Sequence, residues 1–550
     1  MALNKFRFNA NPAVRRLAAA LGGILLSASF APLDMAWAAW LAPGLILFSG
    51  LGTQGGRAFR IGFVAGLAHF LGSLYWLLHM PFTWRGLPIA PAAGWLALAA
   101  YCALYVALWV WICWRFFPGS CDTADQFAAT SWLRRLAWAL ATGAFWTALE
   151  YARGALLTGF PWNFVGASQY KLLPLIQLAA ITGIHGVSFL VVWTSVSLGG
   201  AALVLARRPG AQSVWAGAGL PLLAVAGVAS FGAGKLASIP APARELTVAL
   251  IQPDIPQTLI WDPAGDKVRF QTVLDLSEKA LASNPRLLLW PESAVPDLTD
   301  ETQQAIVRLV RRHDTWLVFC AGTSEPAPRG APHYFNSALL CNPDGVLEAI
   351  YHKRRRVIFG EYIPLVHWLP CLKWLTPIGG EITAGDRPVE FEIQNPSVRI
   401  SVLICFEDMF PQEGREHVGP ETDFLVNLTD DGWFGHGAEQ WQQAASGIFR
   451  AVENGVPLLR CTNDGLTCWA DAQGRIRQIH NVGGDVYGPG FILARIPLRA
   501  PGDRHRTFYN RHGDWFPLSC SGFGIGWLAA TMWRRKGAKL SNAPGAAVQN

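Results

Sequence analysis

The sequence predicts an integral membrane protein in two parts, a bundle of about eight membrane-spanning helices and an α/β domain outside the bilayer. Of its 550 residues, 51% are hydrophobic and 15% are charged, which is more apolar than a soluble chain. Apolar runs of about 20 residues, long enough to cross a bilayer, recur through the first 235 residues. Residues 241–510 hold 25 Lys and Arg against 33 Asp and Glu, whereas the rest hold 20 against 5. Because a nucleic-acid-binding module carries a basic face, this acidic domain is not expected to bind nucleic acid.

Seven apolar runs in residues 1–235 are assigned to seven transmembrane helices, and an eighth run lies in residues 511–536. The eight runs lie near residues 17–31, 35–51, 61–78, 90–114, 136–152, 175–205, 214–232 and 516–533. No small-residue cleavage site follows the first run, so it is expected to be retained rather than removed as a signal peptide. Residues 537–550 are rich in Ala, Gly and Asn and are expected to form a disordered tail.

The basic residues of the loops predict the orientation of the bundle, because cytoplasmic loops collect Lys and Arg. If the N-terminus is cytoplasmic, the cytoplasmic segments carry Lys5, Arg7, Arg15, Arg16, Arg57, Arg60, Arg115, Arg134, Arg135, Arg207, Arg208, Arg534, Arg535, Lys536 and Lys539. The opposite short loops carry only Arg85, Arg153 and Lys171. Seven spans then place residues 236–510 outside the cytoplasm, and the eighth returns the C-terminus to it.

Residues 236–510 are predicted to fold as a separate α/β sandwich, because short apolar segments alternate with amphipathic ones. Strands are expected at 246–251, 287–290, 316–321, 337–341, 398–405, 424–428 and 456–461. Helices are expected at 267–283, 300–313 and 439–454. Several of these strands are wholly apolar, as strands buried on both faces are.

Three strand ends carry groups that could act together in catalysis. Glu292 follows strand 287–290, Cys405 ends strand 398–405, and Lys353 lies between them with Glu361 eight residues further on. Reactive groups of α/β sheets gather beyond the carboxyl ends of strands. A carboxylate can take the thiol proton, the thiolate can attack a carbonyl, and an ammonium group can stabilise the oxyanion. The alternative is that Cys405 is an inert core residue and that the charged groups are simply solvated.

The motifs around these residues resemble the nitrilase superfamily of carbon-nitrogen hydrolases, whose sites contain Glu, Lys and Cys in this order. The matching motifs are WPE at 290–292, HK at 352–353, FGEYIP at 359–364 and ICFED at 404–408. Joined to this many membrane spans, the chain resembles the apolipoprotein N-acyltransferases within that superfamily. Further matches are GFPW at 159–162 with Glu150 and Arg153, IQPD at 251–254, DDGWFG at 430–435 and RCTNDG at 460–465. The resemblance covers essentially the whole chain.

This resemblance implies an αββα domain that moves an acyl chain from a phospholipid donor to the N-terminal α-amino group of a diacylated apolipoprotein. Cys405 would carry the acyl thioester, Glu292 would be the general base and Lys353 the oxyanion stabiliser, with Glu361 and Glu407 as supporting carboxylates. The two substrates would react in turn, in ping-pong order. The family context implies the bacterial inner membrane, with a periplasmic catalytic domain and both termini in the cytoplasm. No cofactor is implied, and a monomer is expected.

A thioester open to water would hydrolyse, so lipid access must be shielded. Residues 362–378 are unusually rich in apolar side chains for a loop and could guide acyl chains from the outer leaflet. The residues expected to line this access are Trp261, Tyr362, Trp368, Trp374 and Trp433. The alternative is that these side chains pack into the core or onto the bundle.

Four residues depart from the family pattern and bear on substrate preference. Asp430 stands where Asn is usual, Ile260 where Lys often precedes the Trp, Phe406 where Tyr often follows the nucleophile, and Trp441 where a Gln-His pair is common. These departures leave the three predicted catalytic positions intact.

Two other functions stay open at this point, a membrane-tethered amide hydrolase and a catalytically silent scaffold that binds lipoproteins. The intact Glu-Lys-Cys set disfavours the scaffold, and the membrane part disfavours a simple hydrolase. A metal site is not expected, because His79, His185, His352 and His436 show no paired spacing typical of metal ligands.

Overall fold

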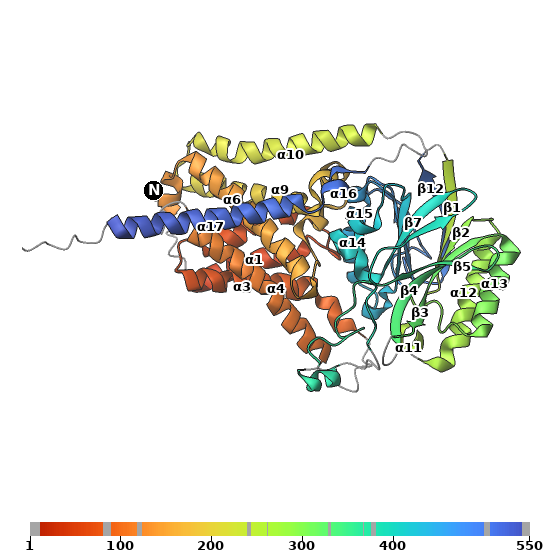
Figure 1. The fold of residues 1–550 in the computed structure, drawn as a ribbon. Coiled ribbons are helices and arrows are strands. Elements are labelled where there is room, and N and C mark those ends of the chain that lie inside the picture. The colour runs from red at the N-terminus through yellow and green to blue at the C-terminus, as the bar shows by residue number, and fades with distance from the viewer. Residues whose placement is uncertain are drawn as a thin grey trace, which may run out of the picture.

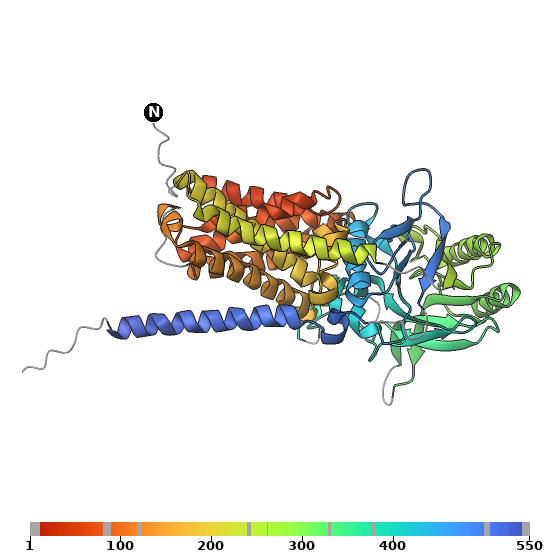
Figure 2. The same ribbon diagram turned by 90° about the horizontal axis from the view of Figure 1, so that it is seen from above.

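The computed structural model describes residues 11–80, 90–117, 124–238, 244–260, 262–327, 332–366, 368–375, 381–499 and 506–541. These residues form a bundle of long helices and an α/β domain that lies at one end of it (Figure 1). The same arrangement is visible from above, where the helices run side by side away from the domain (Figure 2).

Within the described residues, helices lie along the predicted apolar runs, and short helices connect them. The long helices are α1 (Pro12–Ala28), α3 (Gly55–Ser73), α4 (Ala90–Arg115), α6 (Trp132–Ala155), α9 (Ile184–Arg207), α10 (Ser213–Ala237) and α17 (Trp515–Ser541). The shorter ones are η1 (Ala36–Trp40), α2 (Ala42–Gly50), η2 (Tyr75–His79), α5 (Ala124–Ala129), η3 (Leu156–Thr158), η4 (Val165–Gln169), α7 (Leu173–Ile176) and α8 (Ala179–Thr182). Within the described residues, α4, α9 and α10 are long and apolar enough to cross a membrane, judged by length and composition.

Close packing of α3 on α4 depends on two glycines one helical turn apart. A Cβ atom on Gly62 would lie 2.8 Å from Ala107 Cα, and one on Gly66 would lie 2.8 Å from Ala103 Cα. Small residues at this spacing let helix backbones approach closely, which is how helices associate inside a membrane.

The helices differ from the predicted runs in three places. The run at 35–51 is divided into η1 and α2. The run at 175–205 begins with the short helices α7 and α8, because Gly183, with a φ of 69°, interrupts the chain before α9. Helix α17 continues to Ser541, so the expectation of a disordered tail from residue 537 is wrong for 537–541, a segment whose Ala, Lys and Leu favour helix. Residues 542–550 lie outside the described residues.

The α/β domain is a four-layer sandwich, which confirms the αββα part of the predicted fold class. Its two six-stranded sheets have the strand orders β12-β1-β2-β3-β4-β5 and β11-β10-β9-β8-β7-β6. The sheets pack face to face through buried residues of both, such as Leu250 and Val402. Helices α12 (Asp266–Leu281) and α13 (Asp300–His313) cover the first sheet, and α14 (Pro411–His417) and α15 (Glu439–Asn454) cover the second.

The seven predicted strands are all present, and five further strands complete the sheets. The strands are β1 (Arg244–Gln252), β2 (Leu287–Leu289), β3 (Trp316–Glu325), β4 (His333–Cys341), β5 (Leu347–His352), β6 (Glu390–Ile393), β7 (Val398–Ile404), β8 (Phe424–Thr429), β9 (Leu458–Thr462), β10 (Cys468–Ala470), β11 (Ile476–Ile479) and β12 (Gly490–Leu498). The remaining short helices are α11 (Gln257–Ile260), η5 (Pro263–Gly265), η6 (Pro370–Leu375), η7 (Cys405–Met409), η8 (Asp431–Phe434) and α16 (Phe508–His512).

The two parts of the molecule are joined through α15, whose side chains are buried along its whole length. Gln442 makes five hydrogen bonds to the bundle. Its amide nitrogen donates to the carbonyls of Ala31 (2.8 Å) and Ser73 (3.0 Å), and its oxygen accepts from the side chains of Trp76 (3.2 Å), Trp162 (2.8 Å) and Asn163 (3.2 Å).

A second polar contact fixes the start of a bundle helix. Glu453 accepts a hydrogen bond from the backbone N–H of Ile184 (2.8 Å), the first residue of α9. The partial positive charge of a helix N-terminus favours a carboxylate there. Arg450, on the same helix as Glu453, pairs with it at 2.8 Å in the buried junction.

We expect Gln442→Leu to destabilise the protein. The change removes five hydrogen bonds, and each buried polar group left unpaired costs about 1 to 3 kcal/mol. The thermal unfolding midpoint, followed by tryptophan fluorescence in detergent, should fall by several degrees. Gln303→Leu, on the exposed side of α13, removes one bond to the Leu298 carbonyl and should leave the midpoint close to that of the native protein. Equal midpoints for the two variants would contradict the role given to Gln442.

Candidate active site

The structure brings Glu292, Lys353 and Cys405 together beyond the carboxyl ends of three strands. Glu292 lies three residues past the end of β2, Lys353 directly follows β5, and Cys405 directly follows β7. The backbone N–H of Lys353 donates to the Asn336 carbonyl on β4 (2.8 Å), which continues the strand pairing to this residue.

Cys405 occupies a strained turn between β7 and η7. Its φ is 57°, in the left-handed region that a residue with a side chain rarely adopts. The Cys405 carbonyl accepts hydrogen bonds from the side chains of Asn427 (2.8 Å) and Gln443 (3.1 Å), which hold this conformation. The residues that follow enter the apolar core of the bundle, since Met409 and Phe410 belong to the same buried cluster as Trp76.

Lys353 lies in a closed polar network. Its side chain is 1% exposed, and its Nζ lies 2.9 Å from Glu361 and 3.5 Å from Glu292. The Asn336 amide donates to both carboxylates, at 2.7 Å to Glu292 and 3.3 Å to Glu361. A buried ammonium is tolerated when opposite charge and hydrogen bonds surround it, and this network supplies both.

Glu407 ties the lysine segment to the nucleophile turn. Its carboxylate accepts from the backbone N–H groups of Arg354 (2.7 Å), Arg355 (3.0 Å) and Ile404 (2.8 Å). It also accepts from the hydroxyl of Tyr351, at 2.9 Å and 3.0 Å to its two oxygens. The chain before Cys405 and the chain after Lys353 therefore share one anchoring carboxylate.

A second anchor lies behind the nucleophile, in the buried guanidinium of Arg460. It lies 2.5 Å from Asp431 and 3.1 Å from Asp408, and it donates to the Asn427 side-chain oxygen at 2.9 Å. Since Asn427 in turn holds the Cys405 carbonyl, the ion pair helps to fix the turn.

The electrostatics of the site favour a neutral thiol beside a charged amine. Burial raises the pKa of the Cys405 thiol well above its usual value and the nearby Glu292 charge raises it further, while Lys353 acts in the opposite direction. Burial alone would lower the pKa of Lys353, but the charges of Cys405, Glu292 and Glu361 raise it well above its usual value. A thiol in this state needs a base before it can attack. Within the described residues, Oε2 of the 92%-buried Glu292 has no hydrogen-bond partner, so this oxygen can accept a proton.

The predicted access residues have different environments. Trp368 is 84% exposed, so it does not pack into the core. The ring of Tyr362 lies under the Arg356 guanidinium (4.3 Å to the centroid), and its hydroxyl is buried. Trp433 is half-buried on η8, beside Phe434, whose ring packs against Trp76 of the bundle (4.6 Å between centroids). Trp374 lies in η6, and Trp261 lies outside the described residues.

The predicted residues of the membrane part hold the GFPW segment in place. Arg153 donates to the carbonyls of Phe160 (2.9 Å) and Trp162 (2.7 Å), and Glu150 accepts from the backbone N–H of Val165 (2.8 Å). A pocket inside the bundle is lined by both residues, together with His69, Tyr105 and Asn163 among others.

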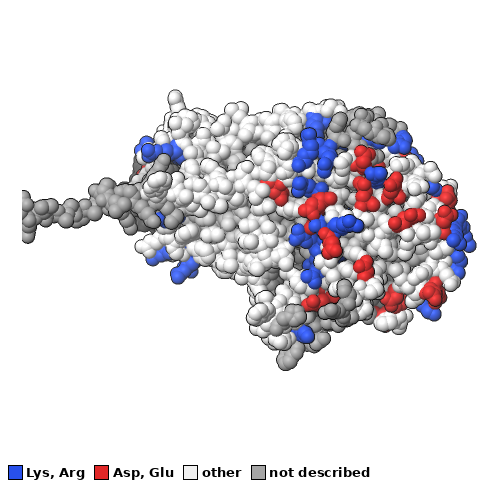
Figure 3. Space-filling model, in the orientation of Figure 1, with Lys and Arg blue, Asp and Glu red and all other residues white. Residues whose placement is uncertain are grey.

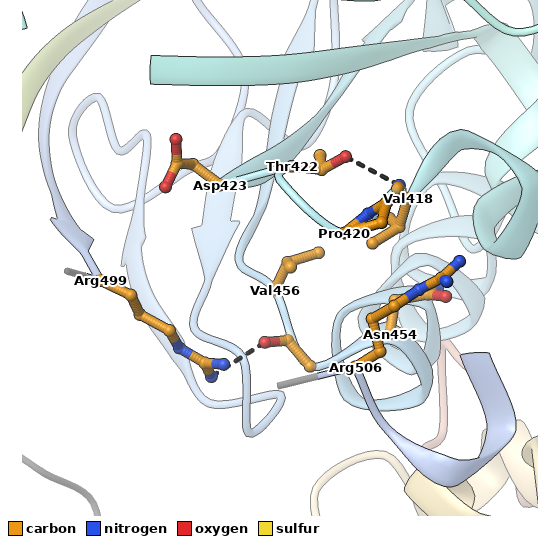
Figure 4. A pocket seen from close by; sticks show the side chains of 10 residues that line it. Val418, Pro420, Thr422, Asp423, Asn454, Val456, Arg499 and Arg506 are labelled. Carbon is orange, nitrogen blue, oxygen red and sulfur yellow. Dashed lines mark hydrogen bonds between the residues drawn. The ribbon is translucent and has the colours of Figure 1, made fainter. Parts of the chain in front are cut away.

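A further pocket, at the surface, contains none of the predicted catalytic residues. It is lined by Val418, Gly419, Pro420, Thr422, Asp423, Asn454, Gly455, Val456, Arg499 and Arg506. Figure 4 shows Arg499 and Arg506 reaching it from separate segments, with Arg499 donating to the Gly455 carbonyl at 3.0 Å. Both arginine side chains therefore lie away from the catalytic network.

Three polar residues of the site were missed by the sequence analysis: Asn336, Asn427 and Gln443. Each touches a catalytic side chain or the Cys405 carbonyl. Asn427 carried a signal that could have been used, because an amide inside the otherwise apolar strand FLVNLT must find a buried partner. No local pattern marks Asn336 or Gln443.

Comparison with known proteins gives matches over both parts of the chain. The family described as apolipoprotein N-acyltransferase N-terminal domain matches residues 22–197, and the carbon-nitrogen hydrolase family matches residues 247–488. The apolipoprotein N-acyltransferase of Geobacter metallireducens is 34% identical over 96% of this chain and 97% of its own length. That of Caulobacter vibrioides is 30% identical over 86% of this chain and 92% of its own length. The crystal structure of an amidase from Nesterenkonia sp. is 18% identical, with a TM-score of 0.35, and covers 49% of this chain and 97% of the amidase.

We expect Asp430→Asn to change the dependence of stability on pH. Burial raises the pKa of Asp430 to about 7; the Asn463 amide offsets part of this effect and the Glu292 charge adds to it. The unfolded chain loses this proton near pH 4. Native Asp430 keeps it up to about pH 7, so the native protein loses stability as the pH rises through this window, by a contribution on the order of 4 kcal/mol for three units.

The asparagine does not titrate, so the variant should be more stable than the native protein at pH 8 and should lose this advantage near pH 4. Thermal unfolding midpoints of both proteins at pH 4, 6 and 8 check this. Buried carboxyls that do not interact with Asp430 are the same in both proteins and cancel in the comparison. A midpoint difference that does not vary with pH would contradict the prediction.

Proposed function

The chain belongs to the apolipoprotein N-acyltransferase family, and we propose that it is an acyltransferase that N-acylates lipoproteins through a thioester on Cys405, with a phospholipid as acyl donor. The observation that supports this mechanism best is the single buried network that joins Lys353, Glu292 and Glu361 beside the Cys405 turn. The hydrolase and scaffold alternatives are not favoured, because the full-length relatives are named as acyltransferases.

In the first half-reaction, Glu292 takes the thiol proton and the sulfur of Cys405 attacks an ester carbonyl of the phospholipid. The Lys353 ammonium stabilises the negative oxygen of the tetrahedral intermediate. The C–S bond forms, the ester C–O bond breaks, and the lysophospholipid leaves as an alcohol with the proton from Glu292. The thioester divides one difficult transfer into two easier steps.

In the second half-reaction, the N-terminal amine of the lipoprotein attacks the same carbonyl. The amine must first lose the extra proton of its ammonium form, because only the neutral nitrogen has a free electron pair. The C–N bond forms, the C–S bond breaks, and a proton from the nitrogen passes through Glu292 to the Cys405 sulfur. The enzyme returns to its starting state after two successive substrates, in ping-pong order.

Glu361 and Glu407 act as positioning residues in this mechanism. Glu361 is the nearest carboxylate to the Lys353 ammonium, so it keeps the ammonium charged and aimed at the site. Glu407 holds the backbone on both sides of the site through three backbone N–H groups, and the Tyr351 hydroxyl also donates to it. Neither residue needs to exchange a proton with substrate.

The placement in the membrane is part of the proposal: eight spans in the bacterial inner membrane, both termini in the cytoplasm and residues 236–510 in the periplasm. The domain limits proposed with it are 1–235 for the first seven spans and 511–536 for the eighth. The face shown in Figure 3 supports a bundle embedded in the membrane. On this face a broad uncharged band separates the charged surface of the domain from the basic residues at the end of the bundle away from the domain. A face without charge is what a lipid environment requires.

Trp368 and its neighbours support a lipid-access role for the loop at 362–375. Leu365 is 64% exposed and Leu369 is 49% exposed beside Trp368, so the loop presents an apolar surface. Apolar surface of this kind commonly marks contact with lipid or a partner. In Figure 1 the teal η6 turn projects from the domain.

Mass spectrometry of the purified protein tests the central step. After incubation with phospholipid and no acceptor, we expect an acyl group on Cys405 that hydroxylamine removes and that a diacylated lipopeptide accepts. Cys405→Ala should gain no acyl mass, and Cys461→Ala, whose thiol is buried in the core, should acylate normally if it folds. Discharge to water alone, without transfer to the lipopeptide, would favour the hydrolase instead.

Replacing Trp368 by Gln should slow acylation of Cys405 without unfolding the protein. The exposed indole makes few packing contacts, so the thermal midpoint should stay unchanged while the acylation rate falls several-fold. Leu347→Gln, an equally apolar-to-polar change at the opposite end of β5 from Lys353, should leave the rate unchanged. Native acylation kinetics in Trp368→Gln would remove Trp368 from the access route.

A further inference from the structure

A series of carboxylates leads from the surface toward Cys405, and we call Asp254, Asp464, Asp430 and Glu292 the acidic lane. Asp254 and Asp464 are half-buried at its outer end, and Asp430 and Glu292 are buried at its inner end. The carboxyls of Asp464 and Asp254 share a hydrogen bond, and Asp464 lies close enough to Asp430 for their charges to interact. Asp430 interacts with Glu292 in the same way, and Glu292 with Cys405.

The lane is built where β1, β8 and β9 end, so its members are held by backbone and not by mobile side chains. Asn463, directly after β9, links them. Its carbonyl accepts from the backbone N–H of Asp254 (2.8 Å), and its side-chain amide donates to Asp430 (3.1 Å). Asp254 has a φ of 56°, a conformation that aspartate tolerates better than most residues.

The negative charge of the outer pair has little compensation. Among the described residues, the one basic group within ion-pair distance of Asp464 is His436, at 3.5 Å, and its side chain is 59% exposed and stacked on Tyr487. No ion pair involves Asp254 in that part of the chain. Burial and the Asp254 carboxylate both raise the pKa of Asp464, as expected of two carboxylates forced to share a proton.

One buried oxygen on the lane is free to accept a hydrogen bond. Glu292 Oε2 has no hydrogen-bond partner in the described residues, whereas Asp464 Oδ1 faces the Nε2 atom of His436 at 3.5 Å. Glu292 is nine-tenths buried, and its charge interacts with Asp430 on one side and Cys405 on the other. A buried carboxylate oxygen without a hydrogen-bond partner lowers the stability of the protein unless a ligand donates a hydrogen bond to it.

We propose that the acidic lane binds the cationic α-ammonium group of the incoming lipoprotein and guides it to the thioester. This assignment rests on the proposed function, since it names the binding site of the second substrate. The ammonium first pairs with Asp464 and Asp254. One N–H bond then breaks, its proton passes to this carboxylate pair and on to water, and the neutral amine advances past Asp430 to attack the thioester.

The assignment predicts a separation between the two half-reactions. Phosphatidylglycerol has no amino group, so with this acyl donor no ammonium enters the outer end of the lane while Cys405 is acylated. Removing charge from Asp464 and Asp254 should therefore leave acylation unchanged and slow only the attack of the lipopeptide. The rate at which a neutral nucleophile attacks the thioester should stay the same.

The test uses Asp464→Asn and the double variant Asp254→Asn with Asp464→Asn, each first acylated with phosphatidylglycerol. We expect discharge by a subsaturating diacylated lipopeptide to be about tenfold slower in the double variant, with the native rate approached at saturation. Discharge by hydroxylamine, which is neutral at pH 7, should keep its native rate. Added salt should slow the lipopeptide reaction of the native protein more than that of the variant, because exposed charge pairs are screened. Asp344→Asn, in the exposed turn between β4 and β5, is the matched control.

Each other outcome counts against the lane. Native discharge by the lipopeptide in the double variant would overturn the assignment. Equal slowing with lipopeptide and hydroxylamine would show that the two residues shape the site without recognising charge, which also overturns it. If the native protein forms no acyl-enzyme at all, the proposed function itself fails, and this result is distinct because it appears before any acceptor is added.

Discussion

The proposed catalytic centre depends on the burial of one positive charge. An ammonium group removed from water costs several kcal/mol unless other charges and hydrogen bonds replace its hydration. At Lys353 that replacement comes from Glu361 and Glu292, which Asn336 holds together. The contacts that make the buried lysine possible are therefore the same contacts that hold a carboxylate and an ammonium beside the thiol. Glu407 extends this arrangement to the backbone on both sides of the site.

The bundle is part of the catalytic architecture rather than a tether for it. The turn that starts at Cys405 continues into Met409 and Phe410, which share an apolar cluster with bundle residues. Helix α15, which supplies Gln443 to the Cys405 carbonyl, also supplies Gln442 to the bundle loops. Adjacent residues of one helix thus bind the nucleophile turn and the membrane part. A movement of the bundle relative to the α/β domain would therefore be transmitted to the Cys405 turn through α15.

The central strands, and the three strand-end residues Glu292, Lys353 and Cys405 that the structure brings together, could be predicted because their signals are local. Apolar strands such as 287–289 and 398–404 have few other interpretations, and the reactive residues follow them directly. The strands β5, β6 and β11 were missed because they are short and alternate with exposed polar residues. Gln442 gave no signal at all, since its partners lie 279 to 411 residues away in the chain. Only the folded structure brings such groups into contact.

The junction at Gln442 imposes an order on the biosynthesis of the protein. Ala31 emerges from the ribosome 411 residues before the side chain that completes its hydrogen bonding. Ser73, Trp76 and Trp162, which bind the same amide, precede it by 369, 366 and 280 residues. The early helices can enter the membrane, but their connecting loops keep unmatched polar groups until the last third of the chain has folded against them. The packing of the bundle loops is therefore completed only after residue 442 has been made.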